Sequence, residues 1–260
     1  MTHSVEAVLF DLGDTVINFG IMDAEGLFHK GAQLTHAYLA ARYPIPPFEE
    51  YRKMHYRGIR RAYLWSRICR REFNSMNTLN GLLQKMNIHL TAVDLDELTW
   101  LWYQPILDIG RMEAGLAEML QELQDSGIKL GIVSNTFISA HCLDRQLKLA
   151  GVLHYFPVRI YSSDVRYQKP HKQIFLMALQ ALGVSPQNTV FVGDLLSNDI
   201  KGARRVGMRT VWKPAEYYPH DREKYNTADA LIQQLVDLPM ALRKWGWKPR
   251  PKAAPVAVKV

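Results

Sequence analysis

The sequence has little cysteine and no long apolar run. Cys69 and Cys142 are its two cysteines among 260 residues, and neither lies in a CxxC or Cys/His metal-ligand spacing. Two cysteines cannot build a disulfide framework, so we expect both to be reduced thiols in the hydrophobic core. No apolar stretch approaches the roughly 18–20 residues of a membrane-spanning helix. The opening residues, MTHSVEAVLFDLG, lead directly into a strand-like segment without a basic signal region, so we expect a cytoplasmic protein.

Acidic residues are fewer than basic ones, which gives a formal net charge of +7. A basic protein attracts anions, so nucleic acids, acidic lipids and phosphorylated metabolites are all admissible partners. The positive charges are spread along the chain and no nucleic-acid-binding module is recognisable, so we do not expect nucleic acid or membrane partners. The segment 248–260 is rich in Pro, Ala and Lys without apolar periodicity, which predicts a flexible basic tail. The sequence does not decide whether the protein is a monomer or a homodimer.

Short apolar runs alternate with helical patterns in two parts of the chain. The runs 7–10, 130–133 and 189–192 are typical of buried parallel strands, and each ends in polar or turn-forming residues. Helical patterns cover 115–126, 139–150 and 171–182, and a glycine follows each of them. This alternation predicts an α/β fold with a doubly wound parallel sheet.

Residues 18–111 have a different pattern, with helical periodicity and no convincing buried strand. Four helices are expected there, in the stretches 28–43, 48–73, 79–88 and 93–107. We interpret this segment as an all-helical cap domain inserted after the first strand. The predicted division is therefore 1–17 and 112–247 for a Rossmann-like catalytic core, and 18–111 for the cap.

Polar residues follow three of the predicted strands directly. Asp11 and Asp14 come after the first strand, Ser134 and Asn135 after the second, and Asp194 after the third. The carboxyl ends of parallel strands meet at one edge of the sheet, where ligands bind in open α/β folds. We therefore expect these side chains to converge on one site.

Four sequence blocks in order carry a family resemblance: VLFDLGDTV at Val8–Val16, GIVSNT at Gly131–Thr136, the Lys-Pro of YQKPHKQIF at Tyr167–Phe175, and VFVGDLLSNDI at Val190–Ile200. In these blocks the chain resembles the haloacid dehalogenase superfamily of phosphohydrolases. The blocks span most of the chain outside the helical segment. The position of that segment, between the first and second blocks, is similar to a C1-type cap.

The resemblance implies a catalytic role for Asp11 and a bound Mg²⁺. Asp11 corresponds to the nucleophile that forms an aspartyl-phosphate. The metal ligands would be the Asp11 carboxylate, the main-chain carbonyl of Gly13 and the Asp194 carboxylate. Asp199 would complete the metal site by holding metal-bound water or by orienting the lysine. Mg²⁺ prefers hard oxygen ligands and keeps several waters, so few protein ligands suffice.

The same resemblance assigns the residues that would hold the phosphoryl group. Ser134, together with Asn135, would hydrogen-bond its oxygens, and Thr15 is also assigned to substrate binding. Lys169 would neutralise charge on the nucleophile and on the group in transfer. The substrate would be a small phosphorylated metabolite.

One position departs from the family pattern. Phosphatases of the family carry a second Asp two residues after the nucleophile, where it protonates the leaving group, whereas this chain has Gly13 there and Asp14 one residue further on. Three explanations stay open. The leaving group could have a low pKa, Asp14 could enter the site, or a cap residue could supply the proton, with these candidates: His29, Lys30, His36, Lys53 and His55.

Two other functions compete with phosphate hydrolysis. A dehalogenase of the same superfamily also uses an Asp nucleophile without a neighbouring acid, but it works without metal. The retention of Asp194 and Asp199 argues against this, because acids held beside Asp11 repel one another unless a cation is present. The other alternative is a catalytically impaired module that binds phosphate or regulates a partner.

Overall fold

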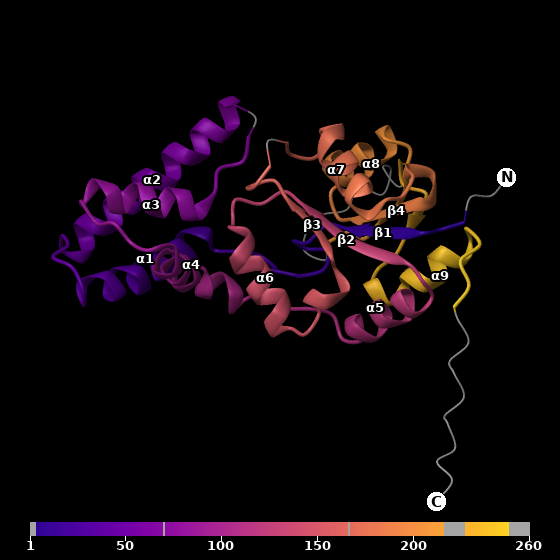
Figure 1. Ribbon diagram of the computed structural model, residues 1–260, viewed down its shortest axis with the longest axis horizontal. Coiled ribbons are helices and arrows are strands. Elements are labelled where there is room, and N and C mark those ends of the chain that lie inside the picture. The colour runs from indigo at the N-terminus through magenta and orange to yellow at the C-terminus, as the bar shows by residue number, and fades with distance from the viewer. Residues whose placement is uncertain (1–3, 70, 166, 216–226, 250–260) are drawn as a thin grey trace, which may run out of the picture.

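The computed structural model describes residues 4–69, 71–165, 167–215 and 227–249. These residues form an α/β fold around a six-stranded, all-parallel sheet with strand order β3-β2-β1-β4-β5-β6 (Figure 1). The strands are β1 (Ala7–Phe10), β2 (Lys129–Ser134), β3 (Val158–Tyr161), β4 (Thr189–Gly193), β5 (Arg209–Trp212) and β6 (Ala230–Leu231). The three predicted strands are confirmed, and β3, β5 and β6 are additions.

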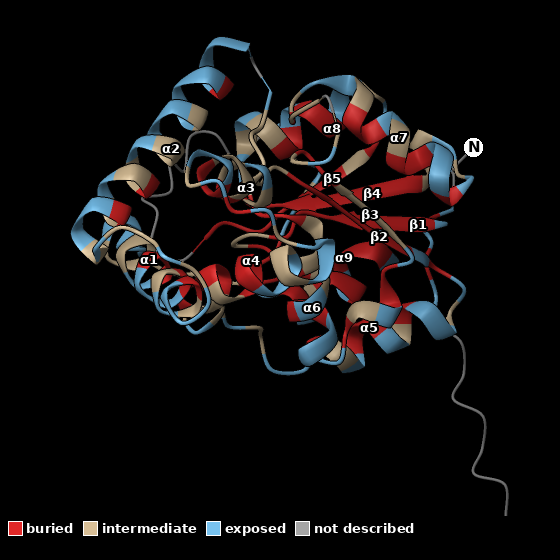
Figure 2. Cartoon of the chain, turned by 60° about the vertical axis from the view of Figure 1, so that its left-hand side comes forward, coloured by how far each residue is buried: buried red, intermediate tan, exposed pale blue. Residues whose placement is uncertain are grey.

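Helices cover both faces of the sheet (Figure 1). Val8 and Phe10 of β1 belong to one core cluster, whereas Ala7 and Leu9 belong to the other, because successive strand residues point to opposite faces. The first face packs against α5 (Leu116–Asp125), α6 (Ala140–Leu149) and α9 (Leu238–Arg243), and the second against α7 (Lys172–Leu182) and α8 (Lys201–Arg205). The central strands β1 and β4 are therefore buried on both sides (Figure 2).

Four helices are inserted between β1 and the sheet-covering α5. They are α1 (Ala24–Ala40), α2 (Phe48–Cys69), α3 (Ser75–Lys85) and α4 (Ala92–Leu107). They share a small core of their own, which includes Leu39, Tyr51 and Leu98. The main chains of Asn18 and Arg111 pair with each other through hydrogen bonds of 2.7 and 2.8 Å, so the two ends of the insertion lie together. The helical insertion after β1 is confirmed, and its division from the core as a separate domain remains a prediction.

Side-chain caps explain where the inserted helices begin. Asp23 accepts a hydrogen bond from the Gly26 N–H at 3.0 Å, and Asn74 accepts one from Met76 N–H at 2.9 Å. Thr91 accepts from Asp94 N–H at 3.1 Å. Each bond satisfies a main-chain donor of the first helical turn that has no partner inside the helix.

One prediction about the cysteines is wrong. Cys142 is buried, as expected, but Cys69 is exposed. The reason is that the last turns of α2 have little packed against them: Trp65 and Ile68 are 62% and 74% exposed. Burial of a thiol requires a neighbouring element to cover it.

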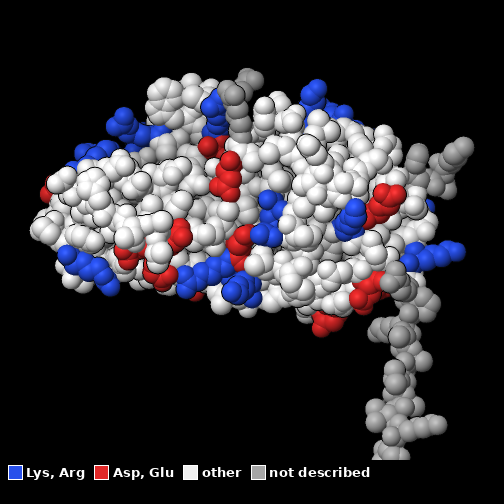
Figure 3. Space-filling model, viewed as in Figure 1, with Lys and Arg blue, Asp and Glu red and all other residues white. Residues whose placement is uncertain are grey.

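The face of the molecule drawn in Figure 3 carries mixed charge. On the face in Figure 3, Lys and Arg lie among Asp and Glu and form no continuous basic area over the described residues. None of the described helices combines the length and apolar character needed to cross a membrane. From residue 250 on, the predicted basic tail lies outside the described residues.

Candidate active site

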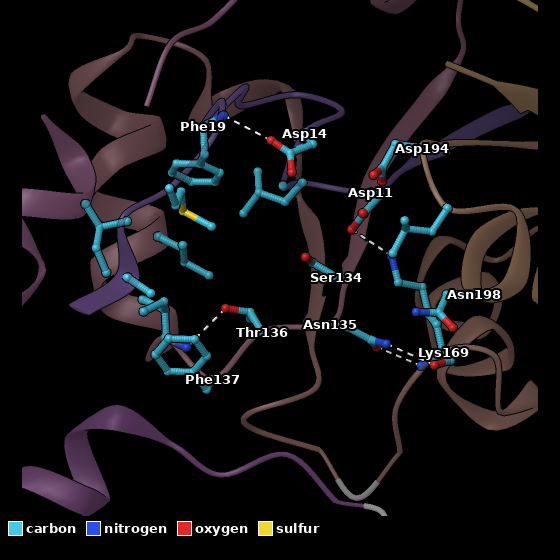
Figure 4. Close-up of a pocket in the computed structure, with 18 of the residues that line it drawn as sticks. Asp11, Asp14, Phe19, Ser134, Asn135, Thr136, Phe137, Lys169, Asp194 and Asn198 are labelled. Carbon is cyan, nitrogen blue, oxygen red and sulfur yellow. Dashed lines mark hydrogen bonds and ion pairs between the residues drawn. The ribbon is translucent and has the colours of Figure 1, made fainter. Parts of the chain in front are cut away.

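The sheet brings Asp11 between two other polar strand ends. β1 pairs with β2 on one side and with β4 on the other, so the residues that follow these strands meet at one edge. Asp11 N–H donates to Val192 O at 2.9 Å, which ties the start of the loop after β1 to β4. Figure 4 shows Asp11 near Asp194 and Lys169, with Ser134 beside them. The predicted convergence is confirmed for these residues.

Lys169 lies between two carboxylates. Its Nζ is 2.6 Å from Asp11 Oδ1 and 2.7 Å from Asp199 Oδ1, and all three residues are buried. Burial alone would lower the pKa of Lys169, but the two carboxylates raise it overall. Lys169 is therefore charged and holds Asp11 in a fixed orientation.

The three acids outnumber this single lysine. Oxygen atoms of Asp11, Asp194 and Asp199 lie within 4.8 Å of one another. Asp194 Oδ1 is buried and has neither a hydrogen bond nor an ion pair among the described residues. Burial, followed by repulsion from Asp11 and Asp199, raises the pKa of Asp194 to about 9. A buried carboxylate oxygen without a donor, beside two further acids, fits a divalent cation with oxygen ligands such as Mg²⁺.

Asp199 needs a glycine beside it. Its Oδ2 accepts a hydrogen bond from the Leu195 N–H at 2.9 Å, and burial contributes most to raising its pKa to about 6. A Cβ on Gly193 would lie 2.6 Å from Asp199 Cγ, which is closer than atoms can pack. Gly193 is therefore required for Asp199 to reach the site.

Asn135 connects two of the sequence blocks. Its Oδ1 accepts from the Lys169 N–H at 2.7 Å, and its Nδ2 donates to Lys169 O at 2.9 Å (Figure 4). The side-chain amide is thereby engaged by the main chain of Lys169, and it positions this lysine. Ser134, at the end of β2, lines the cavity next to Asp11. Phosphate binding by Ser134 and Asn135 stays a prediction.

The loop after β1 places Gly13, Asp14 and Thr15 differently. Gly13 and Asp14 line the cavity, whereas Thr15 is fully buried and is not among the lining residues. Asp14 adopts a left-handed backbone with φ of 56°, and its Oδ1 accepts from the Phe19 N–H at 3.0 Å. The predicted roles of all three residues remain predictions.

The sequence analysis missed a buried lysine beneath this loop. Lys213 Nζ forms an ion pair with Glu113 Oε1 at 3.0 Å and lies 3.3 Å from both Asp14 O and Asn18 Oδ1. Lys213 is 3% exposed. It follows β5 directly, so its position at the carboxyl end of a strand was the available signal, but β5 itself was not predicted.

The five cap residues considered as proton donors do not reach the cavity. None of them is among the described residues that line it. His36 Nε2 is instead 3.0 Å from Pro46 O. His55 is 2% exposed inside the helical insertion, and burial lowers its pKa to about 4. Asp14 is the remaining candidate that the structure brings to the cavity.

The cavity at this edge has a volume of about 310 Å³. One end holds the acids, Lys169, Ser134 and Asn135 (Figure 4). The opposite end is formed by apolar side chains of the insertion and of the loop after β2. The geometry is thus a charged, cation-binding end joined to an apolar compartment.

The chain belongs to the haloacid dehalogenase-like hydrolases, whose family model matches residues 5–207. A solved structure described as a HAD phosphatase from Thermococcus onnurineus is 28% identical, with a TM-score of 0.60, and the match covers 95% of this chain and 100% of that one. The fold and the inserted helices thus agree with the family.

Curated relatives match over shorter stretches. A glyceraldehyde 3-phosphate phosphatase of Methanopyrus kandleri is 38% identical over 92 residues, which is 35% of this chain and 39% of the relative. A phosphoserine phosphatase of Thermus thermophilus is 36% identical over 105 residues, which is 40% of this chain and 41% of the relative. The chain therefore matches less than half the length of these relatives.

Proposed function

We propose that the protein is a magnesium-dependent phosphatase that acts on a small phosphorylated metabolite through an aspartyl-phosphate. The observation that carries the proposal is the buried cluster of Asp11, Asp194 and Asp199, with Lys169 within 2.7 Å of two of them. The phosphatase names of two relatives that match part of this chain support it.

In the proposed reaction, a carboxylate oxygen of Asp11 attacks the phosphorus. A new P–O bond forms to Asp11, and the bond between phosphorus and the leaving-group oxygen breaks. Water then cleaves the aspartyl-phosphate, which releases inorganic phosphate and restores Asp11. Magnesium held by Asp11, Asp194, Asp199 and the Gly13 carbonyl would neutralise charge that otherwise keeps two anions apart.

Two side chains of the cavity support the attack. Lys169 keeps Asp11 oriented and places positive charge beside the reacting oxygen, because it is held between Asp11 and Asp199. Ser134, at the end of β2, would donate its hydroxyl hydrogen to a phosphoryl oxygen. Asn135 acts through Lys169, whose main chain it holds.

Gly13 stands where a general acid is expected, and Asp14 is the acid of the same loop that lines the cavity. We infer that Asp14 provides at most part of the missing proton transfer, because its Oδ1 accepts from the Phe19 N–H and its left-handed backbone turns it toward Phe19. Esters with leaving groups of low pKa should therefore be the better substrates, since general acid help is typically worth about 10²–10⁴-fold.

The test is a panel of acyl phosphates and phosphate monoesters, assayed with and without Mg²⁺. We expect turnover only with Mg²⁺, a steep dependence on leaving-group pKa, and loss of turnover in Asp11→Asn. A protein that binds Mg²⁺ and hydrolyses none of these compounds would instead be the phosphate-binding alternative. Release of halide from haloacids in the presence of a chelator would favour the dehalogenase.

A further inference from the structure

The apolar end of the cavity is built from three separate parts of the chain. The segment before α1 and α1 itself contribute to it, as do α4 and the loop and helix after β2. Its main side chains are Phe19, Leu27, Phe28, Ile106, Phe137 and Leu143. The substrate atoms beyond the phosphorus must lie against this wall, because the charged end holds the phosphoryl-binding groups.

Contacts behind the wall hold it in place. The Phe28 ring stacks on Trp102 at 5.7 Å between centroids and meets Phe137 edge-on at 6.2 Å. Phe137 also stacks on Phe73 at 4.9 Å. Tyr103 lines the cavity too, but its hydroxyl donates to Gln146 Oε1. Its aromatic ring, and not its hydroxyl, is therefore available to contact a ligand. The apolar surface is thus fixed before any ligand arrives.

The charge of the lining residues excludes a second anionic group. Lys169 carries the one positive charge among the described residues of the cavity wall, and Asp11 and Asp199 already bind it. A carboxylate on the substrate would enter the apolar end without a counter-ion and close to Asp14. Burying an unpaired charge in this way is strongly unfavourable.

We propose, resting on the proposed phosphatase function, that the organic part of the substrate is uncharged and apolar. The substrate class is then a phosphate ester of a phenol or of a similar apolar leaving group of low pKa, and not of a hydroxy acid or an amino acid. A second cavity of about 730 Å³ adjoins the first, but its lining includes Glu25, Arg60 and Glu72, so the inference is confined to the first cavity.

The test compares the binding of non-hydrolysable ligands to the full chain with Mg²⁺, by calorimetry. Hexylphosphonate and 6-phosphonohexanoate have the same carbon count, and only the latter ends in a carboxylate. We expect hexylphosphonate to bind at least about tenfold more tightly, because burying an unpaired carboxylate in apolar surroundings is strongly unfavourable. Binding should also strengthen from ethyl- to hexylphosphonate, by up to about fourfold per methylene.

A matched pair of variants locates the effect. Leu27→Lys adds a cation to the apolar wall and should reduce the preference for hexylphosphonate by at least about tenfold. Leu34→Lys adds the same charge to α1 at a position that is 37% exposed and outside the cavity, so it should leave the preference unchanged. Equal effects of the two variants would mean that the cavity wall does not select the ligand.

Failure of this inference is distinct from failure of the proposed activity. If the wild-type chain binds 6-phosphonohexanoate as tightly as hexylphosphonate, the apolar substrate class is wrong, even if phosphate esters are hydrolysed with Mg²⁺. If hexylphosphonate is preferred but no ester or acyl phosphate is hydrolysed, the binding inference stands and the phosphatase reaction is wrong.

Discussion

Gly13 has room for a side chain. The nearest atom to a Cβ built there, apart from the adjacent residues, is Phe19 Cε2 at 3.8 Å, and the backbone of Gly13 is not left-handed. A larger residue can therefore be accommodated without moving the loop, which makes the missing acid testable at this single position.

We predict that Gly13→Asp accelerates hydrolysis of monoesters whose leaving groups have a high pKa. The gain should be at least about tenfold, within the range typical of general acid–base catalysis, and acyl phosphates should gain little. Steady-state kinetics on both substrate types measure it. Gly13→Asn is the control, since it has the same size but no carboxyl proton, and an equal gain in that variant would contradict a proton-transfer role.

The buried lysine under the loop predicts a stability effect. Lys213→Met removes the partner of Glu113 and leaves a mostly buried carboxylate without its cation. Breaking a buried pair in this way typically costs about 3–5 kcal/mol of unfolding free energy, measured by denaturant titration. Glu113 also accepts from the Leu235 N–H at 2.6 Å, which limits its freedom to turn away.

The double variant Lys213→Met/Glu113→Gln isolates this pair. Because it removes both charges, it should be more stable than Lys213→Met alone. If the two variants have the same unfolding free energy, Glu113 does not suffer from the loss of the lysine, and the ion pair is not what holds the loop.

Among the elements, α2 contains a histidine that must stay neutral. His55 is 2% exposed, and neither ring nitrogen has a hydrogen-bond partner among the described residues. It packs between the rings of Tyr51, Tyr56 and Trp102. Burial lowers its pKa from 6.5 to about 4, so the unfolded chain binds a proton here that the folded chain does not.

This difference predicts a loss of stability in acid. Between pH 4 and 6.5 the unfolded state holds more protons at His55 than the folded state does. The contribution of His55 to the free energy of unfolding therefore falls as the pH drops through this window, by up to about 3 kcal/mol. We predict that His55→Phe loses less stability than the wild type between pH 6.5 and 4. Denaturant titrations at both pH values measure this, and parallel curves for the two proteins would contradict it.

The helices and strands also differ in how well the sequence predicts them. The boundaries of α5, α6 and α7 agree with the sequence prediction to within about a residue, because each combines an apolar stripe with a following glycine. β3, with sequence VRIY, was missed because it is short and half-buried, so its apolar pattern is weak. β6 has only two residues, and such an edge strand forms only because β5 lies beside it.

For the whole molecule, the acid cluster predicts that the metal stabilises the fold. A ligand that binds only the folded state adds about 2.7 kcal/mol at a concentration of 100 times its Kd. We predict that Mg²⁺ raises the Tm of the wild type and that Asp194→Asn loses most of this rise, because Asp194 Oδ1 is a buried oxygen of the acid cluster that neither a hydrogen bond nor Lys169 engages. Thermal unfolding with and without Mg²⁺ measures both.

Asp125→Asn is the matched control for this measurement. Asp125 is exposed at the end of α5, away from the cluster, so this variant should keep the full Mg²⁺ response. An equal response in Asp194→Asn and the wild type would mean that the ion does not bind at the acid cluster.

The amino-acid sequence by itself determined the α/β pattern, the helical insertion and the edge at which Asp11, Ser134 and Asp194 meet. It could do so because apolar periodicity is local, and because parallel strands always present their carboxyl ends to one side. Only the tertiary structure decided that Cys69 is exposed, that Lys213 pairs with Glu113 and that the far end of the cavity is apolar. These features depend on which distant elements pack together, and no local pattern records that.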